Sequence, residues 1–371
     1  MKKTISHLYI HIPFCLQKCN YCSFVSFEHK PLADIEDYFD VLRREILVVA
    51  RKYQLSLDTL YIGGGTPTFI RPYLWKDFAE ILSKNITMND NAEVTVEVNP
   101  CTLRKEHFEI FRKIGVNRLS IGVQSFHLSL LREMGRCHTG WQARDVIEDC
   151  IKKGFRTSGD LIYSLPHEDF TAFADDLQQL VATGVGHISL YQLSIEKGTP
   201  WENMPPETMT DGYAEYRYAT WYLKKMGYKQ YEISNFAKLG EESRHNISYW
   251  TGEDYIGVGL SAASFVGGTR YQNTSDFETY LNSSPFLRLP IEMSEKLPKV
   301  KAAGEAAMLL LRTSDGIDKE KFITRFSERQ YNRIAKKLAT FPPEMVVQND
   351  QGIHLTEKGM RVANRIWQEI L

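Results

Sequence analysis

The sequence contains no long hydrophobic run, and this absence argues against a membrane-spanning helix. Among its 371 residues, no apolar segment approaches the ~20 residues that are needed to cross a bilayer. Lys2 and Lys3 precede a short apolar segment, but His11 and Pro13 interrupt it, which makes it a poor signal peptide. We therefore expect a protein that does not span the membrane and that works in the cytoplasm.

An excess of charge of either sign is also missing. The chain has 45 basic and 46 acidic residues, which leaves a formal net charge of −1. Proteins that bind DNA or RNA depend on an excess of positive charge to contact phosphates. We expect no nucleic acid partner.

Cysteine is scarce, and its distribution is uneven. The chain has six cysteines, of which three lie close together and three, Cys101, Cys137 and Cys150, stand alone. So few cysteines in a chain of this length fit a reducing cytosol better than a disulfide framework. We expect the clustered cysteines to form a ligand site and the three isolated cysteines to have no part in it.

The clustered cysteines, Cys15, Cys19 and Cys22, follow the spacing Cys-x3-Cys-x2-Cys. Pro13 disfavours a regular helix through this segment, so we place it on a loop. Three close thiolates can hold three corners of an iron–sulfur cube and leave its fourth iron without a protein ligand. A zinc site that lacks a nearby fourth thiolate, or three buried cysteines, are the alternatives.

Six segments have the composition of β-strands, and helical stretches such as 34–52 and 141–153 separate most of them. The strands are expected at residues 7–12, 59–62, 93–98, 118–123, 159–163 and 187–193. Alternating strands and helices indicate parallel βα units. Residues that do not continue a strand repeatedly follow the strand ends, as in the glycine-rich segment 63–67 and the Asn-Pro pair at 99–100. We therefore predict an α/β fold, a partial TIM-type barrel of six βα units with its site at the C-terminal face of the strands.

The regular alternation stops after Thr199. A helix at 211–226 and a short strand at 231–236 are followed by a polar and aromatic segment at 244–250 and a run of small residues at 257–264. Residues 282–290 have the composition of a linker. Beyond them we expect helices at 302–311, 319–338 and 357–370 and a hairpin with strands at 345–348 and 353–355. The prediction is a barrel at residues 1–235, a barrel extension with a linker at 236–295, and a small helical, winged-helix-like C-terminal domain at 296–371.

The cysteine loop, with Tyr21 before its third cysteine, resembles that of the radical S-adenosylmethionine (SAM) enzymes. More narrowly, the chain is similar to the branch that contains oxygen-independent coproporphyrinogen III dehydrogenase and the HemW heme chaperones. The resemblance extends over nearly the whole chain. It implies a [4Fe–4S] cluster on the three cysteines and SAM bound at the open iron, where the reduced cluster cleaves SAM to a radical. The protein would position the cofactors and exclude water.

The resemblance also implies roles for individual side chains. The amino group of SAM would meet a glycine-rich turn and a carboxylate, namely Gly64, Gly65, Thr66, Pro67 and Glu97. The ribose would bind Gln124 and Asp160, and the carboxylate of SAM would pair with Arg136, whose guanidinium fork suits it. Tyr9 would lie near the sulfonium. Without the resemblance, a structural or solvated role explains these side chains at least as well.

Two departures distinguish the branches. The dehydrogenases carry a fourth cysteine two residues after the third and a longer N-terminal extension, whereas this chain has Phe24 there and only fourteen residues before Cys15. Both features are typical of the HemW type. Residues 245–250 also match the His-Asn-x-x-Tyr-Trp motif that is associated with heme binding in that branch, which implies heme contacts from His245, Tyr249 and Trp250.

Three hypotheses remain open from the sequence. The favoured one is a heme-binding chaperone on a radical SAM scaffold, with heme, a heme-accepting protein and an electron donor as partners. The second is a coproporphyrinogen III dehydrogenase or another porphyrin-directed radical SAM enzyme. The third is a binding protein in which the cluster is only structural.

Overall fold

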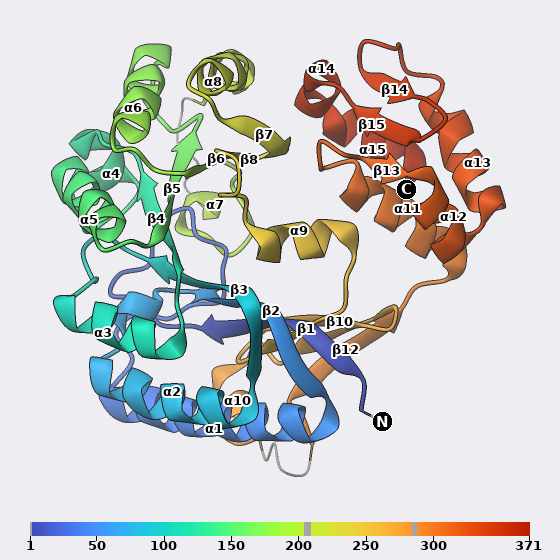
Figure 1. Cartoon of the computed structure of the whole chain (residues 1–371). Coiled ribbons are helices and arrows are strands. Elements are labelled where there is room, and N and C mark those ends of the chain that lie inside the picture. The colour runs from blue at the N-terminus through green and yellow to red at the C-terminus, as the bar shows by residue number, and fades with distance from the viewer. Residues whose placement is uncertain (1, 204–208, 284–287) are drawn as a thin grey trace.

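The structure, a computed structural model, describes residues 2–203, 209–283 and 288–371 (Figure 1). Within them, the strands form one twelve-stranded sheet in the order β12-β11-β10-β9-β1-β2-β3-β4-β5-β6-β8-β7 and one three-stranded sheet in the order β13-β15-β14. No helix in the described ranges combines the length and the apolar character that crossing a membrane requires.

Six parallel strands form the partial barrel, as predicted. They are β1 (Thr4–Ile12), β2 (Gln54–Gly64), β3 (Thr87–Val98), β4 (Arg118–Gln124), β5 (Arg156–Tyr163) and β6 (His187–Gln192). The connecting helices are α1 (Leu32–Lys52), η1 (Pro67–Phe69), α2 (Pro72–Asn85), α3 (Lys105–Ile114), α4 (Leu128–Glu133), α5 (Gly140–Lys152) and α6 (Phe170–Ala182). Figure 1 shows helices α1 to α6 on the outer face of the strands.

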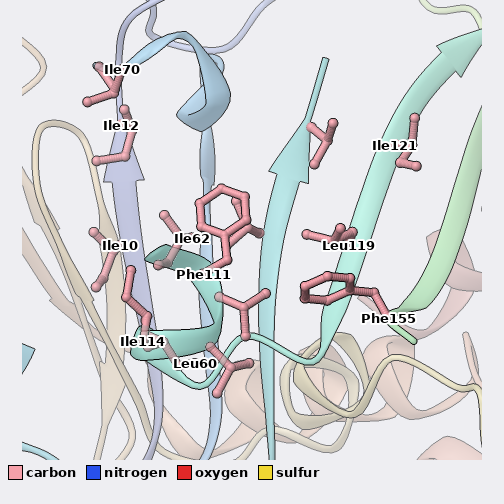
Figure 2. Close-up of a cluster of buried hydrophobic side chains, with 14 of the residues drawn as sticks. Ile10, Ile12, Leu60, Ile62, Ile70, Phe111, Ile114, Leu119, Ile121 and Phe155 are labelled. Carbon is pink, nitrogen blue, oxygen red and sulfur yellow. The ribbon is translucent and has the colours of Figure 1, made fainter. Parts of the chain in front are cut away.

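The period-two alternation along the strands separates the core from the barrel interior. Ile10, Leu60 and Leu119 are fully buried and face the helices, and Figure 2 shows them in one cluster with Phe111 of α3. Each such side chain stabilises the fold by roughly 1.5–3 kcal/mol. Residues between such buried side chains point to the other face because successive side chains alternate, as Glu97 does between Val96 and Val98 on β3. The sheet is therefore apolar towards the helices and carries polar groups inside.

The chain between the barrel and its last module differs from the prediction. Residues 231–236 were expected to form one strand, but they lie in an antiparallel hairpin of β7 (Lys229–Glu232) and β8 (Asn235–Ala237), which pairs with β6. The other elements in this region are α7 (Pro200–Asn203), α8 (Tyr213–Lys225), α9 (Arg244–Thr251) and α10 (Phe277–Leu281). The expected linker falls partly on residues 284–287, outside the described residues.

Four further strands continue the main sheet at its other end. They are β9 (Tyr255–Val258), β10 (Ala263–Val266), β11 (Thr269–Asn273) and β12 (Ile291–Lys296). β9 lies parallel to β1, and β10 to β12 follow as an antiparallel meander. The predicted boundary at residue 235 therefore separates segments that share one sheet; the division into three domains stays a prediction.

The C-terminal module has its own hydrophobic core, in which Leu311, Ile334 and Ile366 are buried. Its elements are α11 (Lys299–Leu310), β13 (Ile317–Asp318), α12 (Lys319–Phe326), α13 (Glu328–Leu338), β14 (Val346–Gln348), β15 (Gly352–Leu355), α14 (Glu357–Arg361) and α15 (Ala363–Ile370). Two helices expected to be continuous are each broken. Ser327 has a φ of 112°, which no right-handed helix contains, and Val362 separates α14 from α15.

Candidate functional site

The cysteine loop is fastened at its base to the first two strands. The Cys15 N–H donates to the Phe27 carbonyl (2.9 Å), and the Phe27 N–H donates to the Pro13 carbonyl (2.7 Å), so the loop closes on itself. The Thr66 N–H donates to the Phe14 carbonyl (2.8 Å). These bonds hold the loop against the turn after β2 with few degrees of freedom.

The glycine-rich turn after β2 is shaped by this loop. A Cβ on Gly64, whose φ is 111°, would lie within 2.4–2.9 Å of ring atoms of His11. A Cβ on Gly65 would lie 2.8–2.9 Å from backbone atoms of Ile12 and Phe14. Only glycine permits this approach, so the turn and the cysteine loop form one rigid unit.

Cys15, Cys19 and Cys22 all line one cavity of about 420 Å³ at the C-terminal ends of the barrel strands. In the described part of the chain, no three His, Cys, Asp or Glu side chains are close enough to hold one metal ion. Each cysteine of an iron–sulfur cube binds a different iron, so its thiols are spaced more widely than the ligands of one ion. Burial raises the pKa of Cys15 and raises that of Cys22 to about 11, and iron coordination would remove these protons. The thiols and their shared cavity fit a cluster better than a zinc ion.

Two polar atoms in the wall of the cavity have no partner among the described residues. Oε1 of Gln124 and Nε of Arg136 are buried and have no hydrogen-bond partner in the part of the chain that the structure describes, and both residues line the cavity. The Arg136 guanidinium is held in place because Nη2 donates to the Gly122 carbonyl (2.6 Å) and Nη1 lies 3.5 Å from Sγ of Cys19. Buried polar atoms normally have a partner. A ligand with oxygen and hydroxyl groups, such as the carboxylate and ribose of SAM, fits this wall.

Two carboxylates lie at the floor of the cavity. Glu97 accepts hydrogen bonds from the Tyr61 hydroxyl (2.8 Å) and the Gly64 N–H (2.9 Å), and burial raises its pKa to about 7. Asp160 accepts a bond from Ser120 Oγ (3.1 Å), and burial raises its pKa. Burial deprives these carboxylates of hydrogen bonds to water. A cationic or hydroxyl-bearing ligand would stabilise their ionised form by replacing those bonds.

Most residues expected at the SAM site do surround this cavity. The lining contains Tyr21, Gly64, Gly65, Thr66, Pro67, Glu97, Gln124, Arg136 and Asp160. Tyr9 is not in the lining; its hydroxyl bonds to Nδ1 of His11 (2.9 Å), and its ring stacks on Tyr61. Two further lining residues were not predicted to contact SAM: Arg118, a buried residue on β4, and Asn246, which was expected only as part of the motif at 245–250.

Comparison with known proteins fits this geometry. The radical SAM superfamily matches residues 9–180, and the HemN C-terminal domain matches residues 297–362. The chain is 33% identical to the heme chaperone HemW of Lactococcus lactis, over 98% of this chain and 96% of that protein. The heme chaperone HemW of Bacillus subtilis is 30% identical over 98% of each chain. The chain belongs to the HemW family of radical SAM proteins.

A solved structure shares the whole fold of this HemW family member. Coproporphyrinogen III oxidase (HemN) from Escherichia coli superposes with a TM-score of 0.85 over 100% of this chain and 90% of that one, at 22% identity. The predicted α/β radical SAM barrel with a small C-terminal domain is thereby confirmed. At this identity the likeness establishes the fold alone.

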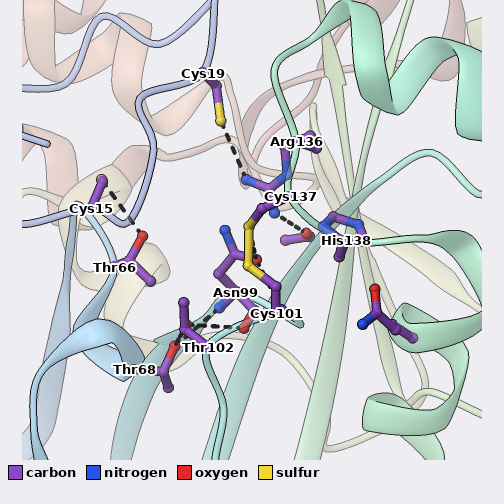
Figure 3. Close-up of a disulfide and its surroundings, with 12 residues drawn as sticks. Cys15, Cys19, Thr66, Thr68, Asn99, Cys101, Thr102, Arg136, Cys137 and His138 are labelled. Atoms are coloured by element: carbon purple, nitrogen blue, oxygen red, sulfur yellow. Dashed lines mark hydrogen bonds between the residues drawn. A yellow bond between two sulfur atoms is a disulfide. The ribbon is translucent and has the colours of Figure 1, made fainter.

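A disulfide corrects the expectation that the other cysteines stand alone. Cys101, after β3, and Cys137, after α4, are bonded with their Cα atoms 6.2 Å apart (Figure 3). Cys137 follows Arg136 directly, and Cys101 is two residues after Asn99, which lines the cavity. The loops converge only in the folded barrel, so the spacing in the sequence could not reveal the pair. The disulfide braces the backbone behind the cavity wall that contains Arg136.

The segment 245–250, for which heme contacts were predicted, lies on α9, and the three predicted residues do not line one cavity. His245 is 1% exposed, and both ring nitrogens are engaged, Nδ1 with Thr59 Oγ1 (2.6 Å) and Nε2 with the Tyr249 hydroxyl (2.7 Å). Burial lowers the pKa of His245 to about 3, so the ring is neutral. Tyr249 and Trp250 line a second cavity, which is larger than the cavity at the cysteine loop. Coordination of iron by His245 would require one of its two hydrogen bonds to break.

Proposed function

We propose that the chain is a heme-binding chaperone on a radical SAM scaffold, which delivers heme to an acceptor protein in the cytoplasm. The observation that carries this proposal is the alignment with proteins named heme chaperone HemW over 98% of the chain. Phe24, in place of the fourth cysteine of the dehydrogenases, supports the same conclusion. The acceptor and the electron donor are proposed as classes of protein.

The proposed cofactor roles follow from the cavity. Cys15, Cys19 and Cys22 would each hold one iron of a [4Fe–4S] cluster. Glu97 would neutralise the amino group of SAM, and Arg136 its carboxylate. When bound, the cluster and SAM supply reductive cleavage of the sulfonium. The residues of the chain bind and orient these groups and keep water away from them.

A second candidate function is coproporphyrinogen III dehydrogenase, because the fold of the Escherichia coli HemN extends over the entire chain. A shared fold does not imply a shared reaction. Phe24 is 65% exposed and offers no iron ligand, so the cysteine arrangement of the dehydrogenases is incomplete here.

One anaerobic experiment separates the two functions. The purified protein is reconstituted with iron and sulfide, titrated with heme, and assayed with coproporphyrinogen III, SAM and a strong reductant. We expect heme binding and no turnover. Protoporphyrinogen IX at several turnovers per chain would establish the dehydrogenase instead, and absence of heme binding with an intact cluster would reject the chaperone.

A further inference from the structure

A second cavity, of about 830 Å³, lies between the end of the main sheet and the C-terminal module. We call it the α11 groove. Its lining comes from α9, β9 to β12, α11 and α12. Figure 1 labels α9, β10, β12, α11 and α12 among them. Its volume is in the upper part of the ~300–1,000 Å³ range that is usual for small-molecule sites.

The α11 groove presents aromatic and aliphatic surfaces. Tyr249 and Tyr255 pack edge to face with ring centroids 4.5 Å apart, and Phe265 lies beside Tyr255 at 6.5 Å. The remaining apolar lining is Trp250, Leu297, Ala302, Ala306, Leu309 and Phe326. Such a lining suits a large planar apolar ligand, because aromatic rings stack on its faces.

The charges at the rim of the groove are not balanced internally. Asp254 pairs with Lys3, and Glu305 pairs with Arg270. The remaining charged lining residues are Glu295, Lys296, Lys299 and Arg325, which leaves three positive charges against one negative. Lys296 and Lys299 are exposed and have no ion pair within the described residues. An occupant with two negative groups at one edge would neutralise the excess, and heme carries two propionates at one edge.

One side chain in the groove is free to coordinate iron. The described lining contains no His, Cys or Met, and the hydroxyl of Tyr249 is bonded to His245. Tyr255 is partly buried, and its hydroxyl has no hydrogen bond within the described ranges. Tyrosine is an established ligand of heme iron.

His245 then has a positioning role behind the groove. A chain of hydrogen bonds runs from Glu253 Oε2 to His7 (2.9 Å), from His7 to Thr59 (2.9 Å) and from Thr59 to His245 (2.6 Å), and ends at Tyr249. These bonds anchor the Tyr249 hydroxyl between β1, β2 and α9. The ring of Tyr249 thereby forms a fixed wall of the groove.

We infer that the α11 groove binds heme, with Tyr255 as the iron ligand and with Lys296 and Lys299 contacting the propionates. This inference rests on the proposed function. Coordination forms a bond between the phenol oxygen and ferric iron and releases the phenol proton to solvent at the mouth of the groove. It places heme away from His245 and outside the SAM cavity.

The test is titration of the purified protein with ferric heme, followed by absorbance and electron paramagnetic resonance. The double substitution Lys296→Glu and Lys299→Glu should raise the Kd about tenfold or more, because two charged contacts become repulsive. Lys301→Glu is the matched control, because Lys301 is exposed on α11, as Lys299 is, but does not line the groove. The Kd of this variant for heme should equal that of the wild type. The dimethyl ester of heme should bind the double variant and the wild type equally.

The ligand is tested by the spectrum. Tyr255→Phe removes only the hydroxyl and should change the ferric spectrum, whereas His245→Gln should leave it unchanged. Heme binding by the wild type with the same Kd in the double variant, or with the same spectrum in Tyr255→Phe, would overturn the inference while the chaperone proposal stands. A wild-type protein that does not bind heme would instead refute the proposed function.

Discussion

Replacement of Glu97 by Gln should stabilise the protein while weakening its binding of SAM. Burial raises the pKa of this carboxyl group from 4.5 to about 7. The folded protein therefore holds the proton more tightly than the unfolded chain does. The carboxyl group accordingly supports folding below pH 4.5, and that contribution is lost as the pH rises to about 7.

The magnitudes follow from the same environment. The raised pKa corresponds to a cost of about 3 kcal/mol for the ionised group at pH 8. Glutamine removes that cost but can accept only one of the two bonds that Tyr61 and Gly64 donate, which loses about 1 kcal/mol. The net expectation is a gain of about 2 kcal/mol in the free energy of unfolding at pH 8. Loss of a charged hydrogen bond to the SAM amino group, worth roughly 1.5–3 kcal/mol, should weaken SAM binding about ten- to hundredfold.

Urea unfolding of the cluster-free protein measures the first effect, and anaerobic calorimetry of the reconstituted protein measures the second. Glu45→Gln is the matched control. Burial also raises the pKa of Glu45 to about 7, but this group accepts its bonds from Tyr280, Asn273 and Gly259 outside the SAM cavity. It should change stability without changing SAM affinity. Unchanged SAM affinity in Glu97→Gln, or reduced stability at pH 8, would refute the reasoning.

Four further outcomes are expected. Simultaneous replacement of the three loop cysteines by Ala should abolish the brown chromophore and the bound iron, whereas Cys150→Ala should not; equal iron content in the triple variant would reject the cluster assignment. Arg136→Ala should weaken SAM binding about ten- to hundredfold, through loss of a charged hydrogen bond worth roughly 1.5–3 kcal/mol, and calorimetry with an unchanged Kd would show that this residue does not hold SAM. Cys101→Ser opens a disulfide that spans 36 residues and should lower the free energy of unfolding by at most about 4 kcal/mol, as urea unfolding would show. Thiol titration of the denatured protein should find four free cysteines before reduction and six after it, and six from the start would contradict the disulfide.

The barrel strands were predictable because each carries a strong local pattern. β1 and β4 alternate buried aliphatic residues with inward-facing ones, and helical segments lie between most of the strands. The strands β9 to β12 were missed because they are short and contain Gly, Ser and charged residues, so pairing with neighbours determines their conformation. The residue type of Ser327 does not predict a break in a helix, yet its positive φ of 112° separates α12 from α13.

The sequence predicted the cysteine loop of the candidate site from its own residues, but it predicted the SAM-binding residues only through resemblance to a family. The cysteine spacing alone indicated a metal centre, whereas the SAM wall depended on resemblance, because a single Gln or Arg at a strand end carries no chemical signature. Arg118 and Asn246 come from segments far apart in the sequence and meet only when the barrel closes. The motif around His245 predicted a heme contact, but burial and hydrogen bonding of that side chain are properties of the tertiary structure.

The pairing of β1 with β9 has a consequence for synthesis of the protein. His7 lies opposite Tyr255, so one edge of the first strand stays open until the ribosome has produced most of the chain. The cysteine loop directly follows that strand, and Nε2 of His11 on β1 bonds to the Val25 carbonyl of the loop (2.9 Å). Domains generally fold as units during translation. The strand that precedes the cysteine loop is therefore fully paired only late in translation, and assembly of the proposed cluster should follow synthesis of β9.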